Sequence, residues 1–447
     1  MSKQQATAVA SSAEANTYKG RLGGILSMVG MCVGLGNMWR FPYLCGQNGG
    51  GAFVFAYILC LIVVVIPLAL VEAAYGKGIR GGIMDAFNAA LKNEKAGKVI
   101  GGIFSVLYST MNFYFIAIMG TCLYFIYASA RSLWNTVPAE EIYPQSLENM
   151  PLMVSMGVIL TILVGVIVYR GASKGIEKVS NIMMPLMFLF FAIVIILAAV
   201  TIPGIGAGYD FYLNPDWSAL GNFDVWVAAM GQALFSVGVG PGCVYIYGTY
   251  FKKKDDMTVN ITTVCVWDTI AALLAGMAII PACIALGHDP ESGARLIFIV
   301  WPSLLSNLPL GNVFGILVFT GIFVAGITSA VAQMVVAVET FSSGLKFDRK
   351  KVSIIATAIT LVGVVISVYS EYFLNFFSDL SGNYGFIVTA GIGSVVYVYV
   401  YGVRKIRENF INPSSDVKLG PWFDFLVRFI AVPIMVVIMI NSIVPIL

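Results

Sequence analysis

Eleven apolar runs, each long enough to cross a lipid bilayer, constrain this chain more than any other feature. They cover residues about 22–44, 51–75, 100–130, 152–169, 179–202, 224–250, 258–287, 312–343, 352–369, 376–402 and 421–446. A helix needs roughly 20 apolar residues to span the hydrocarbon core. Only 11% of the residues are charged, and the mean hydropathy is +0.87. The sequence therefore predicts an all-α polytopic membrane protein with 11 transmembrane helices.

The loops between these runs differ in their content of basic residues. Basic clusters, such as residues 252–254, follow the second, fourth, sixth, eighth and tenth runs. The loops after the third and seventh runs contain only one basic residue each, Arg131 and Arg295. The positive-inside rule therefore predicts a cytoplasmic N-terminus and, with an odd number of spans, a C-terminus outside. Residues 1–20 lack the apolar core of a signal peptide, and we expect a cytoplasmic N-terminal tail there.

No soluble domain is predicted between the runs, and the longest loops are all expected outside. They cover residues 131–151, 203–223 and 288–311. The last loop contains an apolar stretch at 296–304, which can form either an outer lid or a helix that covers the bundle surface. The only histidine, His288, falls in the same loop and is expected to be solvated.

The first apolar run contains a glycine-rich segment, which reads G-M-C-V-G-L-G-N-M-W-R-F-P from Gly30 to Pro42. Each glycine disfavours a helix interior by about 1 kcal/mol relative to alanine, so the helix is predicted to break there. Lipid does not tolerate the freed backbone groups unless the break is buried in protein or lines a cavity. The segment is therefore a candidate site for an ion and a small polar substrate.

A second break is predicted in the sixth run, which reads G-Q-A-L-F-S-V-G-V-G-P-G from Gly231 to Gly242. Its proline, Pro241, removes a backbone donor and clashes with the preceding turn. Either glycine cluster alone can also reflect close helix packing. Breaks five runs apart favour a 5+5 inverted repeat with discontinuous helices 1 and 6, dividing the chain into 21–202, 203–402 and a last part, 403–447, with a cytoplasmic loop and helix 11.

Polar side chains inside the apolar runs are the candidates for ion binding. Asp268 lies deep in the seventh run, where an ionised carboxylate is costly unless a cation or a donor compensates it. It is either an ion ligand, with neutral oxygens from Asn37 and Ser236, or a structural carboxylate bonded to Ser236 or a helix end. Oxygen-only ligation favours a hard monovalent cation such as Na⁺. Thr328 and Ser329 offer further hydroxyls in the eighth run, although such groups often bond only their own helix.

Several other function classes receive no support from the sequence. The net charge of +3 suggests no nucleic-acid partner. All seven cysteines lie in or at the ends of apolar runs without metal-type spacing, so they are interpreted as core residues. The sequence holds no Ser/His/Asp or Cys/His constellation and no phosphate loop, so we do not expect an enzyme.

The first-helix sequence R-L-G-G-I-L-S-M-V-G-M-C-V-G-L-G-N-M-W-R-F-P-Y, followed by N-G-G-G-A-F from Asn48 to Phe53, closely resembles the neurotransmitter:sodium symporter family. The resemblance covers essentially the whole chain and is strongest to the bacterial amino-acid transporters of that family. Eleven spans, in place of the twelve common in animal members, are similar to the short bacterial form. This resemblance implies a multi-pass protein of the bacterial cytoplasmic (inner) membrane.

The resemblance implies two sodium sites. The first would use the carbonyl of Cys32 and the side chains of Asn37, Ser236 and Asp268, together with the substrate carboxylate. The second would use the carbonyls of Gly30, Val33 and Ala325 and the hydroxyls of Thr328 and Ser329.

The resemblance also bears on chloride. Animal members need chloride near the first sodium site and carry a serine where this chain has Ala272. Since Asp268 stands where many relatives have asparagine, its fixed carboxylate can supply the missing negative charge, and we predict that chloride is not required. Gln232 and Tyr57 match the other chloride-site positions, which keeps the question open.

The implied substrate is an amino acid, because Gly34 replaces the aspartate with which monoamine transporters bind an amine. Gly238 and Pro241 replace larger residues of some relatives, which implies a roomy pocket for an aromatic or polar neutral side chain. We expect a neutral amino acid with a hydrophobic or aromatic side chain. The resemblance implies substrate contacts from Met31, Cys32, Gly34, Leu35, Gly36, Thr110, Tyr114, Phe235, Ser236, Gly238, Pro241, Ser329 and Gln333. Of these, Phe235 would be an aromatic lid and Gln333 would add a polar group at the side-chain end.

The gates depart from the family pattern. At the outer gate, formed with Tyr114 and Phe235, Arg40 would pair with an acid in the tenth helix. The expected position is Ser378, with Asp379 next to it. At the inner gate, Tyr18 stands where the family has a tryptophan, and Ser343 stands where the family has the acidic partner. These replacements predict a different inner latch that involves Lys19 and Glu339.

The sequence thus predicts a sodium-coupled amino-acid symporter that works by alternating access in the lipid bilayer. Two alternatives remain, namely a transport-inactive amino-acid sensor of the same fold and a symporter of another small zwitterion. The amino acid itself is not predicted, and both a monomer and a homodimer are compatible with the sequence.

Overall fold

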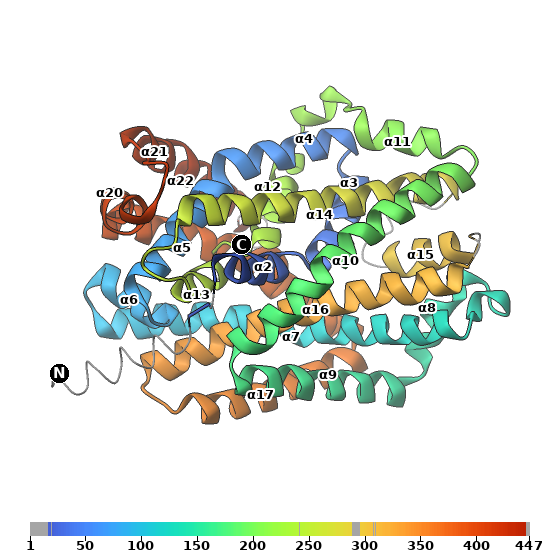
Figure 1. The fold of residues 1–447 in the computed structure, drawn as a ribbon, viewed down its shortest axis with the longest axis horizontal. Coiled ribbons are helices and arrows are strands. Elements are labelled where there is room, and N and C mark those ends of the chain that lie inside the picture. The colour runs from blue at the N-terminus through green and yellow to red at the C-terminus, as the bar shows by residue number, and fades with distance from the viewer. Residues whose placement is uncertain are drawn as a thin grey trace.

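The computed structural model describes residues 17–18, 20–240, 242–287, 296–306, 308 and 310–443, and the regular elements in these ranges are all helical (Figure 1). Within these ranges, nine helices are long and apolar enough to cross a membrane, or ten if one bent pair is a single span. The nine cover Gly51–Ile79 (α4, η2, α5), Glu94–Ala130 (α7), Met150–Arg170 (α9), Met184–Thr201 (within α10, Ala172–Thr201), Met257–Ala285 (α14), Gly311–Leu345 (with α16 at Gly311–Gly344), Arg349–Tyr369 (α17), Glu371–Ser414 (α18 to η9, with α19 at Phe386–Val395) and Pro421–Ile443 (α21, η10, α22). The predicted all-helical membrane class is confirmed.

The bent pair is the predicted break in the first run. Helix α2 (Arg21–Cys32) ends at Val33, whose backbone is extended (φ −74°, ψ 104°), and η1 (Gly36–Arg40) and α3 (Phe41–Gln47) continue at an angle of 52° to it. Helix interrupted by extended backbone leaves amides and carbonyls without helical partners. The break therefore exposes polar backbone inside the bundle.

The sixth run also breaks where its glycines predicted. Helix α12 (Phe223–Val237) is followed by Gly238 and Gly240, whose φ values of 78° and 112° favour glycine, and α13 (Cys243–Thr249) begins after Gly242. At 1.5 Å per residue, the 15 residues of α12 extend only about 22 Å. Neither piece reaches the length of a membrane span alone. The count of eleven spans therefore stays a prediction, as does the inverted repeat.

The two broken helices pack against long continuous helices. In Figure 1, α7 and α16 run through the middle of the bundle, α9 and α17 flank them, and α2 lies near the centre beside α14. Close helix approach depends on glycine at some contacts. A Cβ added to Gly363 of α17 would lie 2.2 Å from the ring of Phe113 on α7.

Short helices gather at the two ends of the bundle. Helices α8 (Ala139–Glu148), α11 (Ile205–Leu213) and α15 (Leu296–Ser306) lie at one end, and α6 (Ile83–Leu91) lies at the other (Figure 1). The sequence analysis anticipated a helix only at α15, because the other three interrupt polar loops. Phe298 and Trp301 of α15 are buried against the bundle, in line with a covering helix, whereas its action as a lid stays a prediction.

Some element bounds differ from the predicted runs. The third helix begins at Glu94 and not near residue 100, and the tenth span extends from Glu371 to Ser414, beyond the predicted 376–402. Charged turns at the helix ends lie outside the apolar run but continue the helical backbone, and a hydropathy pattern misses them. Of the predicted tail, residues 1–16 and Lys19 lie outside the described residues, as do His288 and Arg295.

Candidate ion and substrate site

A buried polar cluster joins the broken first helix, α12 and α14. Asn37 Nδ2 donates to Asp268 Oδ1 at 2.8 Å and to the Asp268 carbonyl at 2.9 Å, and Ser236 Oγ donates to Asp268 Oδ2 at 2.7 Å. Asn37 and Asp268 are fully buried. An ionised carboxylate at such a place requires donors or a cation nearby. The structure thus brings together three side chains that the sequence analysis assigned to the first sodium site.

The same cluster organises the unwound backbone. Asn37 Oδ1 accepts from the Gly34 amide at 3.1 Å, and the Cys32 thiol donates to the Val237 carbonyl of α12 at 3.4 Å. One break is therefore held to the other by backbone acceptors as well as by side chains. The donor set of carboxylate, carboxamide, hydroxyl and backbone carbonyl consists of hard oxygen atoms, which fit a sodium ion.

A second oxygen cluster lies where α16 contacts the first break. Thr328 Oγ1 donates to the carbonyls of Gly30 and, at 2.8 Å, Ala325. Ser329 Oγ donates to the Met31 carbonyl at 3.1 Å and to the Ala325 carbonyl at 3.3 Å. Because hydroxyls of α16 reach carbonyls freed at the end of α2, the contact is more than bonding within one helix. Val33, the remaining predicted member, is fully buried at the adjoining break.

Two glycines of the first break are required by their surroundings. A Cβ added to Gly34 would lie 2.3 Å from Ser329 Oγ, and one added to Gly36 would lie 2.8 Å from the Phe235 ring. Any side chain at Gly34 would therefore displace the Ser329 hydroxyl. This geometry leaves no room for an aspartate at Gly34.

A cavity of about 30 Å³ lies between the two breaks, α7 and α16. Nine predicted substrate residues line it, namely Met31, Cys32, Gly34, Gly36, Phe235, Ser236, Gly238, Ser329 and Gln333. Of the remaining four, Leu35 and Tyr114 are buried outside this lining, and Pro241 lies outside the described residues. The predicted site is thus brought together around one cavity.

Thr110 was assigned to the wrong side of α7. It lines a separate apolar groove of about 350 Å³ between α7, α16 and α17, and its hydroxyl donates to the Leu107 carbonyl at 2.7 Å. The face of α7 that lines the central cavity carries Tyr108, Met111 and Phe115. Successive helix residues are turned by about 100°, so Thr110 points away from that face. We therefore remove Thr110 from the site.

Six cavity residues were missed by the sequence analysis. They are Tyr108, Met111, Phe115, Val237, Cys243 and Phe386. The spacing of the first three follows one helical face, but 21 tyrosines and 29 phenylalanines gave that spacing no distinction. Cys243 lies 3.1 Å from the Met31 sulfur, across the two broken helices.

Glu72 of α5 was also missed. Its carboxylate accepts from the Gly240 amide at 2.9 Å and from the Tyr245 amide at 3.3 Å, and its side chain is buried. The carboxylate thus satisfies amides freed where the sixth run unwinds. A charged residue inside the second apolar run was the signal that could have found it.

On the side of the cavity toward α15, Arg40 covers the aromatic lid. Its guanidinium carbon lies 4.9 Å from the centroid of the Phe235 ring, and its Nη1 donates to Gln232 Oε1 at 3.0 Å. Gln232 Nε2 in turn donates to the Gly36 carbonyl at 3.0 Å. Arg40 is therefore linked to the unwound backbone of the first helix. Its predicted pairing with Asp379 stays a prediction.

On the opposite side, toward α6, a polar network surrounds Glu339 of α16. Glu339 Oε1 accepts from Arg349 Nε at 2.9 Å and from the Tyr250 hydroxyl at 3.3 Å. Tyr18 packs edge-on against the Tyr250 ring, and its amide donates to the Tyr250 carbonyl at 3.0 Å. Lys19, the other member of the predicted latch, lies outside the described residues. The Glu339 carboxylate is paired with Arg349.

Ser343 has a structural role in the same region. Its hydroxyl accepts from the Gly82 amide at 2.8 Å, which is the amide that precedes α6, and donates to the Glu339 carbonyl at 2.8 Å. Ser343 thus joins the end of α16 to the start of α6. It does so without a charge.

The residues at the positions that match a chloride site differ in their hydrogen bonding. Ala272 and Tyr57 are fully buried, and the Tyr57 hydroxyl has no hydrogen-bond partner among the described residues. Gln232 is held by Arg40 and the Gly36 carbonyl. A carboxylate, Asp268, lies in the same buried region and is bonded to Ser236.

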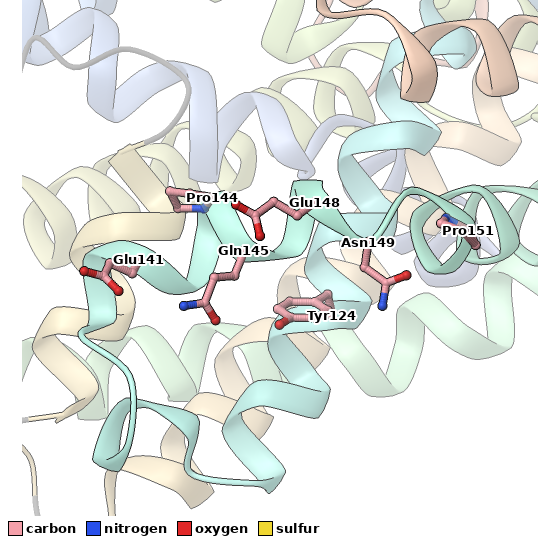
Figure 2. Close-up of a pocket in the computed structure, with 7 residues that line it drawn as sticks. All are labelled: Tyr124, Glu141, Pro144, Gln145, Glu148, Asn149 and Pro151. Atoms are coloured by element: carbon pink, nitrogen blue, oxygen red, sulfur yellow. The ribbon is translucent and has the colours of Figure 1, made fainter.

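A larger depression of about 690 Å³ lies away from the broken helices. Figure 2 shows its lining on α8, the end of α7 and the start of α9. The residues are Tyr124, Glu141, Pro144, Gln145, Glu148, Asn149 and Pro151. None of them contributes to the buried polar clusters, and we assign no ion or substrate to it.

Known proteins match the chain along most of its length. The model of the Sodium:neurotransmitter symporter family matches residues 15–155 and 141–446. An uncharacterized sodium-dependent transporter of Methanocaldococcus jannaschii is 31% identical over 92% of this chain and 87% of its own. A second one, from Bacillus subtilis, is 30% identical over 75% of this chain and 74% of its own.

The fold also matches a solved structure, the crystal structure of MhsT in complex with L-phenylalanine. The TM-score is 0.87 at 27% identity, and the match covers 96% of this chain and 99% of MhsT. The fold, the broken helices and the family match all support the same assignment. The chain belongs to the Sodium:neurotransmitter symporter family and is a sodium-coupled, multi-pass membrane transporter of a small molecule.

Proposed function

We propose that the protein imports a neutral, hydrophobic or aromatic amino acid together with sodium by alternating access, without a need for chloride. The observation that carries this proposal is the fully buried Asp268, bonded to Asn37 and Ser236 between two broken helices. Intramembrane ionisable groups at discontinuous helices are typical of ion and substrate sites.

Two sodium ions would occupy the two oxygen clusters. The first ion would be held by the Cys32 carbonyl, Asn37, Ser236 and Asp268, and the second by the carbonyls of Gly30, Val33 and Ala325 with Thr328 and Ser329. Support comes from the convergence of Thr328 and Ser329 on carbonyls of the first break. A cation would replace the present hydroxyl hydrogen bonds as the partner of these oxygens.

The negative charge beside the first ion would come from Asp268, and chloride would be unnecessary. Ala272 offers no hydroxyl to an anion, and Gln232 is already bonded to Arg40 and the Gly36 carbonyl. A second anion beside a buried carboxylate would also be repelled. The Tyr57 hydroxyl, which has no hydrogen-bond partner among the described residues, favours an anion there.

The substrate would bind between the two breaks. Amides at Leu35 and Gly36, with Tyr114, would bind its carboxylate, since unwound helix ends offer unpaired donors to anions. The Gly34 amide already donates to Asn37 Oδ1 and would contribute only by exchanging that partner. Met31, Phe235, Gly238, Ser329 and Gln333 would surround the remainder. The aromatic and sulfur-containing lining of the cavity, together with the likeness to MhsT bound to L-phenylalanine, supports a hydrophobic or aromatic side chain.

Coupling follows from shared ligands. If the substrate carboxylate completes the first sodium site, sodium and substrate each raise the affinity of the other by the same factor. Each net charge moved inward gains about 2.3 kcal/mol per 100 mV. Two sodium ions with a zwitterion would therefore make uptake voltage-driven.

The same proposal includes eleven spans, with α12 and α13 as the discontinuous sixth. The five-helix halves would be 21–202 and 203–402, with the N-terminus inside and the C-terminus outside a bacterial inner membrane. The basic loops lie after alternate runs, which supports this orientation. Arg40, Tyr114, Phe235 and Asp379 would close the outer side.

Uptake into proteoliposomes tests this function. Labelled amino acids would be offered under an inward sodium gradient, with chloride present or replaced by gluconate. We expect sodium-dependent accumulation of one group of amino acids, equal in both anions. Sodium-dependent binding without accumulation would contradict transport and indicate a sensor of the same fold.

A further inference from the structure

Gln333 of α16 presents a hydrogen-bond acceptor that nothing in the described chain satisfies. The residue is 2% exposed and lines the central cavity, and its Oε1 has no hydrogen-bond partner among the described residues. A buried acceptor without a partner is costly. A ligand in this cavity that brings a donor to Oε1 would remove that cost.

Gln333 lies where the end of the side chain of a bound amino acid would be. It follows Ser329 by one helical turn on the same face of α16, a rise of about 6 Å. Ser329 bonds the unwound first helix at the Met31 carbonyl, where the amino and carboxyl groups would lie. Gln333 would therefore meet the end of a side chain of aromatic length.

The rest of the cavity lining favours a ring. The Phe386 ring lies 5.1 Å from that of Phe235 and 5.6 Å from that of Tyr108. The sulfur atoms of Met31 and Cys243 adjoin them. Aromatic faces and thioether sulfur both make favourable contacts with an aromatic ring.

We infer that the preferred substrate carries an aromatic ring with a hydrogen-bond donor, an indole N–H or a phenol O–H, which Gln333 Oε1 accepts. The inference rests on the proposed amino-acid site and deepens it. Phenylalanine is close to tyrosine in size but brings no donor, so it leaves the acceptor unpaired. A site built to bond a substrate O–H or N–H discriminates strongly against the analogue that lacks it.

Equilibrium binding to the purified full chain in sodium tests the inference. We expect tryptophan or tyrosine to bind about 5- to 150-fold more tightly than phenylalanine, the range for one unpaired buried acceptor. The analogues 1-methyltryptophan and O-methyltyrosine keep the ring but lose the donor. They should lose this advantage on the unmodified protein, which requires no variant to fold.

The Gln333→Met variant separates recognition from a structural role. Methionine keeps the length of the side chain but removes the acceptor, so the ratio of the tryptophan or tyrosine affinity to the phenylalanine affinity should collapse to about one. A structural role would instead weaken all amino acids alike and leave the ratio intact, which would overturn the inference. Equal binding of phenylalanine and the donor-bearing amino acids to the unmodified protein would also overturn it.

Failure of the inference and failure of the proposed function give different results. Binding of phenylalanine or leucine in sodium, with no advantage for a donor, removes the role of Gln333 but keeps the amino-acid site. Absence of sodium-dependent binding for every amino acid tested removes the proposed site itself.

Discussion

The two sides of the central cavity are closed by different chemistry. Toward α15, one buried arginine, Arg40, lies over the Phe235 ring and is linked through Gln232 to the Gly36 carbonyl. Toward α6, Glu339 joins Arg349 and Tyr250 in a network that is partly exposed, with side-chain exposures of 24% for Arg349 and 19% for Glu339.

This difference indicates which of the two closures responds directly to occupancy of the ion and substrate site. The Arg40 side is bonded to the unwound backbone that would bind sodium and substrate, so occupancy of the site acts on it directly. The Glu339 side joins the ends of helices to one another, through acceptors such as the Phe251 carbonyl for Arg80 and the Val168 carbonyl for Arg349. It therefore stabilises a helix arrangement and meets the substrate only through that arrangement.

A change at the first break should have the largest effect, because this break lines the central cavity itself. Gly34→Ala would place a Cβ 2.3 Å from Ser329 Oγ, and overpacking of this kind costs about 1–3 kcal/mol or more. We expect sodium-driven uptake to be abolished, measured in proteoliposomes. Gly20→Ala is the matched control, because no atom lies within 4 Å of its added Cβ. Normal uptake by Gly34→Ala would show that the close approach to Ser329 is dispensable.

The second-largest effect is expected from a change at Arg40, which lies over the Phe235 ring. Arg40→Gln removes a buried, charge-assisted hydrogen bond worth about 1.5–3 kcal/mol, so substrate should leave toward that side about 10- to 150-fold faster. The dissociation rate of labelled amino acid from the purified protein measures it, and the sodium concentration for half-maximal binding should change far less. An unchanged dissociation rate would mean that Arg40 does not retain the substrate.

The ion pair on the opposite side should contribute less, since it is partly exposed. Glu339→Gln weakens its bonds to Arg349 and Tyr250, at a cost of about 1 kcal/mol after allowance for screening. We expect about a fivefold shift toward a state open on the α6 side, measured as alkylation of a cysteine introduced at Tyr18.

The control for that shift is Glu94→Gln, which breaks an exposed pair with Lys98 (2.7 Å) at a helix end. It should leave alkylation unchanged. Equal alkylation of the Glu339 and Glu94 variants would remove Glu339 from the closure.

The smallest effect is expected at Ser343. Ser343→Ala deletes one of the two acceptors of the Gly82 amide, and Asp85 Oδ2 remains at 2.9 Å. The cost is that of one neutral hydrogen bond, about 0.5–1.5 kcal/mol of stability. The melting temperature should fall slightly while uptake stays within about twofold of the unmodified protein. A loss of uptake well beyond twofold would make Ser343 part of the latch and not only a cap for α6.

Sequence reasoning located the breaks and the polar cluster because glycine, proline and a charged group are costly inside an apolar helix. Gly34, Gly238 and Asp268 each violate the local pattern, and each lies at the centre of the structure. Thr110 was misplaced since the pattern of α7 is apolar on every side, and the rotation of a helix is then set by packing alone. Helix α6 was missed because nine residues within a polar loop carry little signal.

The gates were the least predictable part. Arg40 was expected from the sequence, but its bond to Gln232 depends on how α12 packs against the first helix. Glu339 was expected in the latch, yet Arg349 lies ten residues beyond it, on the next helix, and only the turn between α16 and α17 brings the two together. Such pairs depend on tertiary geometry, to which a single sequence gives no access.

The central claim is that Asp268 is both a sodium ligand and the fixed charge that replaces chloride. The most direct test is the sodium dependence of labelled amino-acid binding to the purified protein and to Asp268→Asn, each in sodium chloride and in sodium gluconate. We predict identical sodium curves in the two anions for the unmodified protein, and a curve shifted to much higher sodium for Asp268→Asn. Binding that requires chloride in the unmodified protein, or an unchanged sodium curve for the variant, would contradict the claim.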